Sequence, residues 1–144
     1  MWKGFKLHMA VVDCGAPICA VLTSASTHDS QVAIPLMQMG AGRAAVLYDL
    51  ADSAYDAAQI MGYSRSMGHV PIIEPSGRNG KARRMDPAEK ARYRERTSVE
   101  RAFSNFKDNC GGRSVRVRGA AKVMAHLMFG VVALTAACLV RLIE

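Results

Sequence analysis

The stretch FKLHMAVVDCGAPICAVLT, residues 5–23, decides how the fold of this chain begins. Apolar side chains recur at every second position from Phe5 to Val11, which is the period of a strand with one buried face. A second apolar run, partly β-branched, covers residues 17–23, and the Asp-Cys-Gly sequence at residues 13–15 supplies turn chemistry between the two runs. We therefore predict an antiparallel hairpin.

Helical and strand patterns alternate after this hairpin. Residues 29–39 carry apolar side chains near helical spacing, although Pro35 limits the regularity of the first turn. Residues 44–50 are short and apolar enough for a buried strand, residues 54–67 have a helical pattern, and residues 69–74 favour another strand. The order predicts an α/β fold that starts with an antiparallel pair.

The clearest helix start is the sequence Asp86-Pro87-Ala88-Glu89. Asp is a favourable N-cap, Pro suits the first helical position, and Glu three residues after the cap completes a capping box. We predict one helix from there to about residue 109, where Gly111 and Gly112 follow as a stop. A second helix is predicted over residues 120–142.

Positive charge is concentrated in one part of the chain. Residues 76–118 hold thirteen of the nineteen Lys and Arg but only five of the twelve Asp and Glu. This window therefore carries a charge of +8, and the rest of the chain sums to −1, which gives the net charge of +7. Phosphates release condensed counterions when Lys and Arg replace them, and nucleic acid is therefore the leading class of partner. A solvated basic loop is the structural alternative.

Cysteine usage and composition narrow the class of protein. With 50% hydrophobic and 22% charged residues, the 144-residue chain can bury the core of one domain. Its four cysteines form no C-x-x-C pair and have no histidine at zinc-ligand spacing, which favours reduced thiols in a cytoplasm. Residues 1–13 contain no continuous apolar run of the export type, so we expect no signal peptide.

One candidate site is a polar stripe on the predicted helix. On a regular helix Tyr93, Arg96, Glu100 and Lys107 fall on one narrow face, with a carboxylate between two cations and a phenol. A surface ion pair between Arg96 and Glu100 explains the same spacing and contributes only tenths of a kcal/mol. Phe103 lies on the same stripe, which favours a face that meets protein or ligand.

The second candidate is a cluster of carboxylates at the end of the strand predicted over residues 44–50. Asp49, Asp52 and Asp56 lie at or just beyond this strand end, where α/β folds place ligand groups. Hard cations such as Mg²⁺ take carboxylate oxygens. An Asp before a helix is also a common cap, so cap and ligand both remain open for Asp52.

Six phrases of the sequence resemble the catalytic domain of bacterial insertion-sequence transposases of the DDE type, which has a ribonuclease-H-like fold. They are WKGFKLHMAVVD, TSASTHDSQVAIPL, LYDLADSAYDA, GHVPIIEP, RYRERTSVERAFSNFKD and VRVRGAAKVMAHLMFG, and together they cover nearly the whole chain. The most specific part is the Y-x₂-R-x₃-E-x₆-K signature, met in full by Tyr93, Arg96, Glu100 and Lys107. By this resemblance Asp52 and Glu100 match the second and third acidic residues of the catalytic triad, and Asp49 and Asp56 are neighbours.

One departure from the family concerns the first acidic residue. In the family it lies on a strand just before the segment that resembles KGFKLHMAVVD, whereas here only Met1 and Trp2 precede that segment. Before the cluster of Asp49, Asp52 and Asp56, the only carboxylates are Asp13 and Asp29, and neither is a convincing substitute for the first acidic residue. We therefore expect residues 1–144 to form a partial catalytic domain. Its fold should be a ribonuclease-H-like mixed sheet that lacks its first strand and is flanked by helices. A basic linker is expected within it at about residues 76–85.

The resemblance also implies a mechanism and partners. Divalent Mg²⁺ (or Mn²⁺), held by Asp52 and Glu100, would support phosphodiester cleavage and strand transfer of an insertion sequence. The expected partners are the terminal inverted repeats and the target DNA, with a homodimer left open, in a bacterial cytoplasm. The residues expected to contact DNA are Tyr93, Arg96, Lys107, Arg116 and Arg118.

Three further expectations follow. With one triad carboxylate absent, the chain should be inactive alone, and a non-catalytic DNA-binding or inhibitory fragment is the alternative function. Asp52 and Glu100 should face the same cleft.

Residues 123–140 contain no Asp, Glu, Lys or Arg and reach the threshold for a membrane helix, but the resemblance favours a core helix and no stable membrane association.

Overall fold

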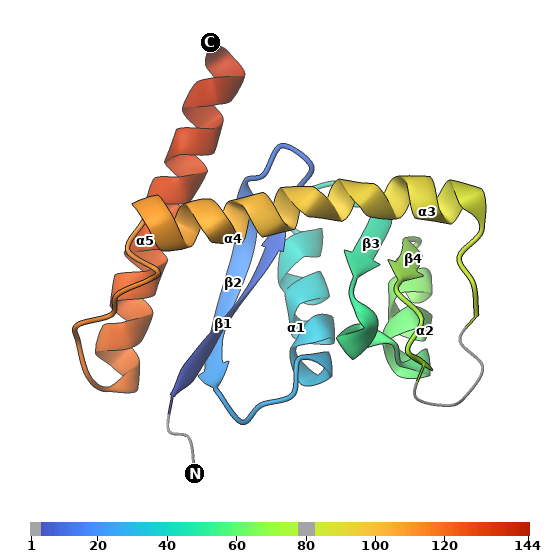
Figure 1. Cartoon of the computed structure of the whole chain (residues 1–144), viewed down its shortest axis with the longest axis horizontal. Helices are drawn as coiled ribbons and strands as arrows, with labels where there is room; N and C mark the ends of the chain where they lie inside the picture. Colours follow the sequence, from blue (N-terminus) through green and yellow to red (C-terminus); the bar gives the residue numbers. More distant parts are fainter. Residues whose placement is uncertain (1–3, 78–82) are drawn as a thin grey trace. The chain divides into compact units, whose positions relative to one another are not determined.

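The computed structural model describes residues 4–77 and 83–144. The chain divides into two compact units, one made of Met1–Thr27 with Thr97–Glu144 and the other of His28–Arg96. Figure 1 shows the elements in chain order, coloured from the N-terminus to the C-terminus. Of the basic linker expected at about residues 76–85, positions 78–82 lie outside the described residues.

The first unit is built on the predicted hairpin. Strands β1 (Phe5–Val11) and β2 (Pro17–Ser24) pair antiparallel, with a register shift at the end of β1. Gly15 has a φ of 85° in the connecting turn and donates its N–H to the carbonyl of Val12 at 2.8 Å, so this turn uses the left-handed conformation that glycine tolerates. The hairpin prediction is confirmed.

Two helices pack on this hairpin. Helix α4 (Thr97–Asn109) contacts β1, helix α5 (Ala120–Ile143) contacts β2, and the two helices contact each other. The Cys138 thiol lies 3.4 Å from the carbonyl of Gly15, which attaches α5 to the hairpin turn. The core of this unit consists of the buried side chains of Met9, Ala16, Ala102, Phe106, Val123, Leu127, Leu134 and Cys138.

Helix α5 contains the apolar segment that reached the threshold for a membrane helix. Among the described residues it is the one helix long and apolar enough to cross a membrane, a test that the core helix of a soluble protein also passes. Five of its residues are buried within the first unit: Val123, Leu127, Gly130, Leu134 and Cys138. The helix therefore supplies core side chains, and its apolar length is weak evidence for a membrane protein.

The second unit has a parallel pair of strands covered by helices. Strand β3 (Tyr48–Ala51) pairs with β4 (Val70–Ile73), and Asp49 lies opposite Pro71. Its small core joins Ala33, Ile60 and Ile73. The other elements are α1 (Ser30–Ala41), the 3₁₀ turn η1 (Ser53–Tyr55), α2 (Ala58–Ser66), α3 (Pro87–Tyr93) and the 3₁₀ turn η3 (Arg94–Arg96).

Element types are predicted well in this unit and element bounds less well. Helix α1 forms with Pro35 inside it. The strand predicted over residues 44–50 forms only from Tyr48, and the helix predicted over residues 54–67 starts with η1 before α2 begins. Apolar composition predicted both strands. Their bounds, however, depend on which residues of β3 and β4 pair through backbone hydrogen bonds.

The prediction of one continuous helix from residue 87 to about 109 is wrong. The capping box is present, because the Asp86 carboxylate accepts from the Glu89 N–H at 2.8 Å and Glu89 accepts from the Asp86 N–H at 3.2 Å. However, α3 ends at Tyr93, and η3 separates it from α4. A 3₁₀ turn has about 3.0 residues per turn, so the regular 100° spacing assumed for the polar stripe does not hold across it.

The α/β class is confirmed and is consistent with a ribonuclease-H-like domain. Within the described residues the strands form two separate two-stranded sheets, β1 with β2 and β3 with β4. One pair is antiparallel and the other is parallel, which is the mixed pairing expected. The one mixed sheet that we expected is therefore present as two separate pairs of strands.

Two helical glycines provide a test of the core of the first unit. A Cβ added at Gly130 would lie 2.3 Å from the Cys110 carbonyl oxygen and 2.8 Å from the Phe106 ring, whereas one at Gly62 meets open space. We expect Gly130→Ala to lower the free energy of unfolding by about 1–3 kcal/mol through overpacking. We expect Gly62→Ala to raise it by roughly 0.5–1 kcal/mol, because alanine favours a helix interior. Urea unfolding of both variants checks this, and equal effects would show that Gly130 is not tightly packed.

Candidate functional site

Asp52 occupies the end of strand β3 and begins a turn. Its backbone is extended, and its Oδ1 accepts a hydrogen bond from the Ala54 N–H at 3.0 Å as the N-cap of η1. The cap interpretation of Asp52 is therefore confirmed. Because the cap fixes the side chain at the carboxyl end of a strand, it also holds the carboxylate where α/β folds present ligand groups.

Arg96 contacts the other oxygen of this carboxylate. Its Nη2 donates to Asp52 Oδ2 at 3.2 Å, and the Arg96 and Asp52 side chains are 26% and 37% exposed. The pair is half-buried, so water screens it less than an ion pair on the open surface. A signature cation and a candidate metal ligand are thus in direct contact within the second unit.

Tyr93 extends this contact into a chain of polar groups. The Arg96 guanidinium carbon lies 5.9 Å from the centre of the Tyr93 ring, and the Tyr93 hydroxyl donates to Glu74 Oε2 at 3.3 Å. Burial raises the pKa of Tyr93, Arg96 opposes the rise and Glu74 adds to it. The structure therefore brings together three residues that the sequence singled out, namely Asp52, Tyr93 and Arg96.

Two neighbours of this group were not predicted from the sequence. Glu74 follows strand β4 and accepts from Tyr93. Tyr55 ends η1, and its pKa is raised to about 12 by burial, then by the negative charges of Asp29 and Asp52, while Arg96 lowers it. The available signals were the position of Glu74 at a strand end and the three-residue spacing from Asp52 to Tyr55.

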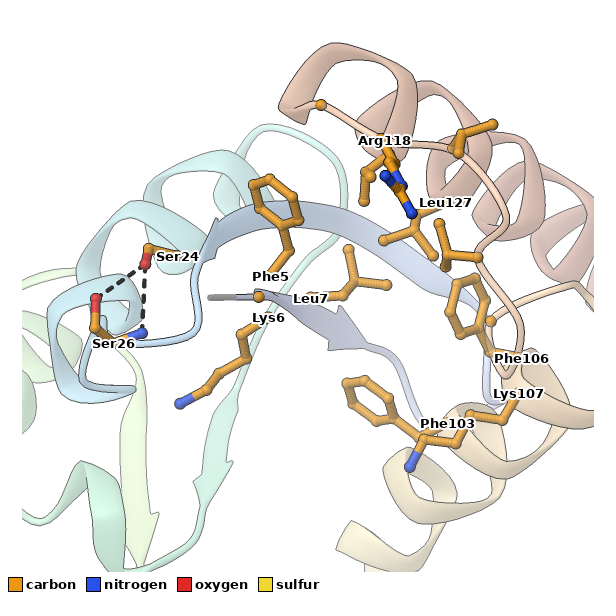
Figure 2. Close-up of a pocket in the computed structure, with 16 residues that line it drawn as sticks. Phe5, Lys6, Leu7, Ser24, Ser26, Phe103, Phe106, Lys107, Arg118 and Leu127 are labelled. Atoms are coloured by element: carbon orange, nitrogen blue, oxygen red, sulfur yellow. Dashed lines mark hydrogen bonds between the residues drawn. The ribbon is translucent and has the colours of Figure 1, made fainter. Parts of the chain in front are cut away.

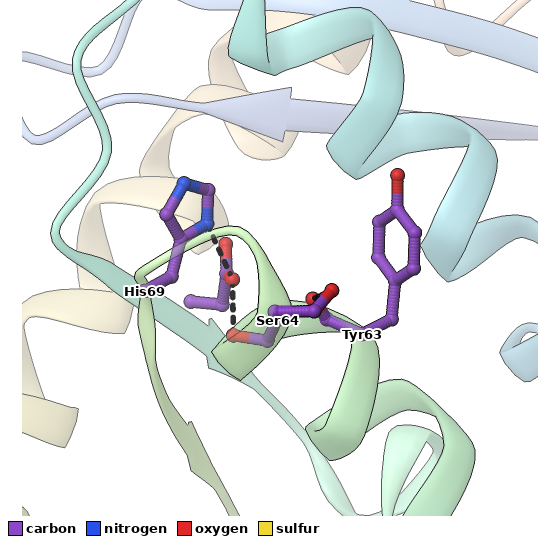
Figure 3. Close-up of polar contacts among 5 residues, drawn as sticks. Tyr63, Ser64 and His69 are labelled. Carbon is purple, nitrogen blue, oxygen red and sulfur yellow. Dashed lines mark hydrogen bonds and ion pairs between the residues drawn. The ribbon is translucent and has the colours of Figure 1, made fainter.

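The other carboxylates of the predicted cluster support the local fold. The Ser64 hydroxyl donates to Asp49 Oδ2 at 2.6 Å, and His69 Nδ1 lies 2.9 Å from the same oxygen. Figure 3 labels Ser64 and His69, with these polar contacts drawn as dashed lines. Asp56 Oδ2 accepts from the Ser76 N–H at 2.6 Å. These contacts join the start of β3 to the end of α2, and η1 to the segment after β4.

Glu100 and Lys107 lie on α4 in the first unit, so the signature is divided between the two units. Glu100 is in the first turn of α4 and Lys107 in the last, and both are exposed. Tyr93 and Arg96 belong to the second unit. The expectation that Asp52 and Glu100 face one cleft stays a prediction.

A cavity of about 850 Å³ in the first unit brings two of the predicted DNA contacts together. Figure 2 shows Lys107 and Arg118 at this cavity with Phe103, Phe106 and Leu127. Lys6 also lines it and was not predicted, since a lysine in an alternating strand carries no signal of its own. The cavity therefore combines an apolar lining with cationic groups.

Arg116 and Arg118 belong to the segment between α4 and α5, residues 110–119. Both side chains are exposed, and Arg118 lines the cavity while Arg116 is not among the lining residues. Gly119, with a φ of 90°, ends the segment as the N-cap of α5. Arg116 and Arg118 thus present exposed guanidinium groups shortly before α5 begins, and guanidinium groups suit phosphate oxygens.

The donor chemistry suits a hard divalent cation, but the number of donors is small. Asp52 and Glu100 offer carboxylate oxygens, the donors that Mg²⁺ and Mn²⁺ prefer. Within residues 4–77 and 83–144 no group of three or more His, Cys, Asp or Glu is placed to hold a metal ion. The two candidate ligands therefore fit in kind, but two carboxylates are fewer than a two-metal site needs.

The strand-end carboxylate, the cationic groups and the α/β fold are compatible with a protein that processes DNA. A family model described as a transposase DDE domain matches residues 1–136, and the chain belongs to this family. Transposition of DNA, with polynucleotide cleavage dependent on a divalent metal, is the general activity of the family. No curated protein and no solved structure matches the chain.

The raised pKa of Tyr55 predicts how the stability of the second unit depends on pH. Its ordinary pKa is 10.0 and its value in the folded chain is about 12. The unfolded chain therefore loses this proton first, so the stabilisation is complete below pH 10 and is lost as pH rises to about 12. Tyr55→Phe should remove this part of the alkaline loss, whereas Tyr63→Phe should retain it. Urea unfolding across this window measures both, and identical pH profiles would contradict the assignment.

Proposed function

We propose that this chain is catalytic machinery of an insertion-sequence transposase, with Asp52 and Glu100 as carboxylate ligands of a divalent metal. The DNA contacts in this proposal are Tyr93, Arg96, Lys107, Arg116 and Arg118. The observation that carries it is the contact of Arg96 with Asp52 at the end of β3, 3.2 Å between Nη2 and Oδ2. The family match supports the reaction class.

Arg96 has a geometry suited to handling phosphate. Its guanidinium is always charged and presents a planar fork, which matches phosphate oxygens as well as it matches a carboxylate. Because the Asp52 pair is half-buried and not enclosed, Arg96 can exchange the carboxylate for a phosphate oxygen of bound DNA. Tyr93, next to the same guanidinium, can stack on or position the DNA end.

A divalent metal held by Asp52 and Glu100 would supply the activation of water or a 3′-hydroxyl and would stabilise the leaving oxygen in phosphodiester cleavage and strand transfer. Asp52 contributes an oxygen fixed by a backbone cap, and Glu100 contributes one from the first turn of α4. The segment that carries Arg116 and Arg118, together with Lys107, holds the DNA backbone. The place of action in this proposal is the bacterial cytoplasm, and the substrates are terminal inverted repeats and target DNA.

A second candidate function is DNA binding without catalysis. It is favoured by the shortage of carboxylates, because the described residues include no group of three potential metal ligands. Two close cations need carboxylates from both sides, and Asp52 with Glu100 leaves one side to water. In this case the chain occupies transposon ends without cutting them.

The DNA contacts predict a salt dependence. We expect Arg116→Ala combined with Arg118→Ala to reduce the slope of log K against log salt by about 1.8, close to two released counterions on duplex DNA. The matched control is Arg65→Ala on α2, which lies outside the basic window and should leave the slope unchanged. Fluorescence anisotropy titrations at several salt concentrations give the slopes. A slope unaffected by the double change would move the DNA interface elsewhere.

The shortage of ligands predicts the outcome of an activity assay. We expect the 144 residues alone to neither cleave nor join DNA with Mg²⁺, and we expect activity from a version extended at the N-terminus by an aspartate-bearing strand. In the extended protein Glu100→Gln should abolish activity and weaken Mg²⁺ binding measured by calorimetry. Asp108→Asn, an exposed acid on the same helix, is the control. Robust cleavage by the 144 residues would show that another ligand is supplied from within.

A further inference from the structure

Glu74 is an acidic side chain at the candidate site that neither the proposed metal chemistry nor the proposed DNA contacts use. It directly follows β4, and its N–H donates to the Ala51 carbonyl of β3 at 3.0 Å. The backbone at Glu74 is therefore fixed by the parallel pair of strands, at the same edge from which Asp52 emerges. A carboxylate on such a fixed backbone is suited to hold another side chain in place.

Tyr93 is the side chain that Glu74 holds. The Tyr93 hydroxyl donates to Glu74 Oε2 at 3.3 Å, although the two residues are 19 positions apart in the chain. A phenol has one hydroxyl proton to donate, and an ionised carboxylate only accepts. While this hydrogen bond is made, the proton is not available to a phosphate oxygen of DNA.

The ring of Tyr93 has a separate contact, with the guanidinium of Arg96. The Arg96 guanidinium carbon lies 5.9 Å from the centre of the ring, and Arg96 Nη2 donates to Asp52 Oδ2 at 3.2 Å. These contacts run from the end of β3, through Arg96 and Tyr93, to the end of β4, and the pairing of the two strands closes them into a loop. The hydroxyl and the ring of Tyr93 are thus held by different partners within the second unit.

The state of the phenol at neutral pH suits this arrangement. Burial raises the pKa of Tyr93 from its ordinary value of 10.0, Arg96 lowers it, and the charge and the hydrogen bond of Glu74 add to the rise. The phenol therefore keeps its proton at neutral pH and remains a donor to Glu74. Its ring is half-buried, and an aromatic ring held in one orientation is a stacking surface for a base, because every base has a π face.

We propose that Glu74 is a positioning residue, which holds the Tyr93 ring as a stacking platform for a base at the DNA end. Tyr93 then contacts DNA through its ring, and its hydroxyl serves to orient that ring. Orientation before binding reduces the side-chain entropy that is lost when the base stacks. This inference rests on the proposed function, in which Tyr93 contacts DNA, and it is independent of the metal ligands.

A direct hydrogen bond from the Tyr93 hydroxyl to a DNA phosphate is the competing arrangement. It would require the phenol to leave Glu74, and it would place the Glu74 carboxylate beside a phosphate of the same charge. Loss of the acceptor at position 74 would then strengthen DNA binding, whereas it weakens binding if Glu74 holds the ring. The two arrangements therefore predict opposite effects.

Two uncharged replacements of Glu74 separate its acceptor from its charge. Glu74→Gln keeps a side-chain oxygen that accepts from Tyr93, Glu74→Leu does not, and both remove the same negative charge. We expect the dissociation constant for DNA to be roughly 3- to 10-fold higher for Glu74→Leu than for Glu74→Gln, the effect of one hydrogen bond. Fluorescence anisotropy with a labelled duplex that ends in an unpaired thymidine tail measures both constants. Circular dichroism checks that each variant is folded.

The same replacements in a Tyr93→Phe background test whether the effect passes through the hydroxyl. Without the hydroxyl, Glu74→Leu and Glu74→Gln should bind DNA within about 2-fold of each other. The matched control is Glu95, an exposed acid in η3 that pairs with Arg92, where the Leu and Gln replacements should bind equally. The proposal is overturned if the difference at Glu74 persists with Tyr93→Phe, or if Glu74→Leu binds no more weakly than Glu74→Gln.

An alkaline titration of Tyr93 provides a measurement that does not involve DNA. We expect Glu74→Leu to lower the pKa of Tyr93, because the charge and the hydrogen bond that add to the rise are lost, and we expect Glu95→Leu to leave it unchanged. Phenolate absorbance measures this, and subtraction of the matching Tyr93→Phe curve isolates Tyr93. A pKa that does not respond to Glu74→Leu would show that Glu74 does not hold the phenol.

Tyr93→Ala separates failure of this inference from failure of the proposed function. Loss of the ring should raise the dissociation constant for the tailed duplex roughly 10-fold or more, as for the loss of one stacked base. Unchanged binding would remove Tyr93 from the DNA contacts and would contradict the proposed function together with this inference. Weakened binding by Tyr93→Ala, with equal binding by the two Glu74 variants, would overturn the positioning role alone.

Discussion

The parallel pairing of β3 with β4 is the constraint on which the candidate site depends. The Ala51 carbonyl accepts from the Glu74 N–H at 3.0 Å, so the residues that follow the two strands emerge at the same edge. Asp52 and Glu74 are those residues. Each is then contacted by a side chain from the segment that ends the second unit, Arg96 in one case and Tyr93 in the other. Two short strands thus arrange a carboxylate, a guanidinium and a phenol that lie far apart in the chain.

The first unit depends on close packing around Phe106. Its ring fills the space between Gly112 and Gly130, where an added Cβ would lie 2.3 Å from the ring and 2.8 Å from it, respectively. This packing holds the segment after α4 against α5, and the same segment carries Arg118 to the cavity that Lys107 also lines. A steric requirement for glycine therefore positions cationic groups. The helix that closes this core, α5, has exposed apolar side chains on its other face.

Much of the fold was predictable from local patterns. The alternation from Phe5 to Val11, the turn glycine at position 15 and the capping box at Asp86 act within a few residues, so each was recognised without knowledge of the rest of the chain. The break at Arg94–Arg96 was not recognised, because its sequence has good helix formers and no Gly or Pro. Where a helix with favourable composition tightens into a 3₁₀ turn is decided by its tertiary neighbours.

The sequence by itself determined the family, the α/β class and the identity of the residues that carry charge and carboxylates, because these depend on residue type and spacing. Tertiary structure alone decided which of them touch. Three aspartates near the end of β3 look alike in sequence, yet Asp49 accepts from Ser64, Asp56 accepts from a backbone N–H, and Asp52 contacts Arg96. Their partners are 15, 20 and 44 residues away along the chain. Such contacts depend on how distant segments pack, and no local pattern records that packing.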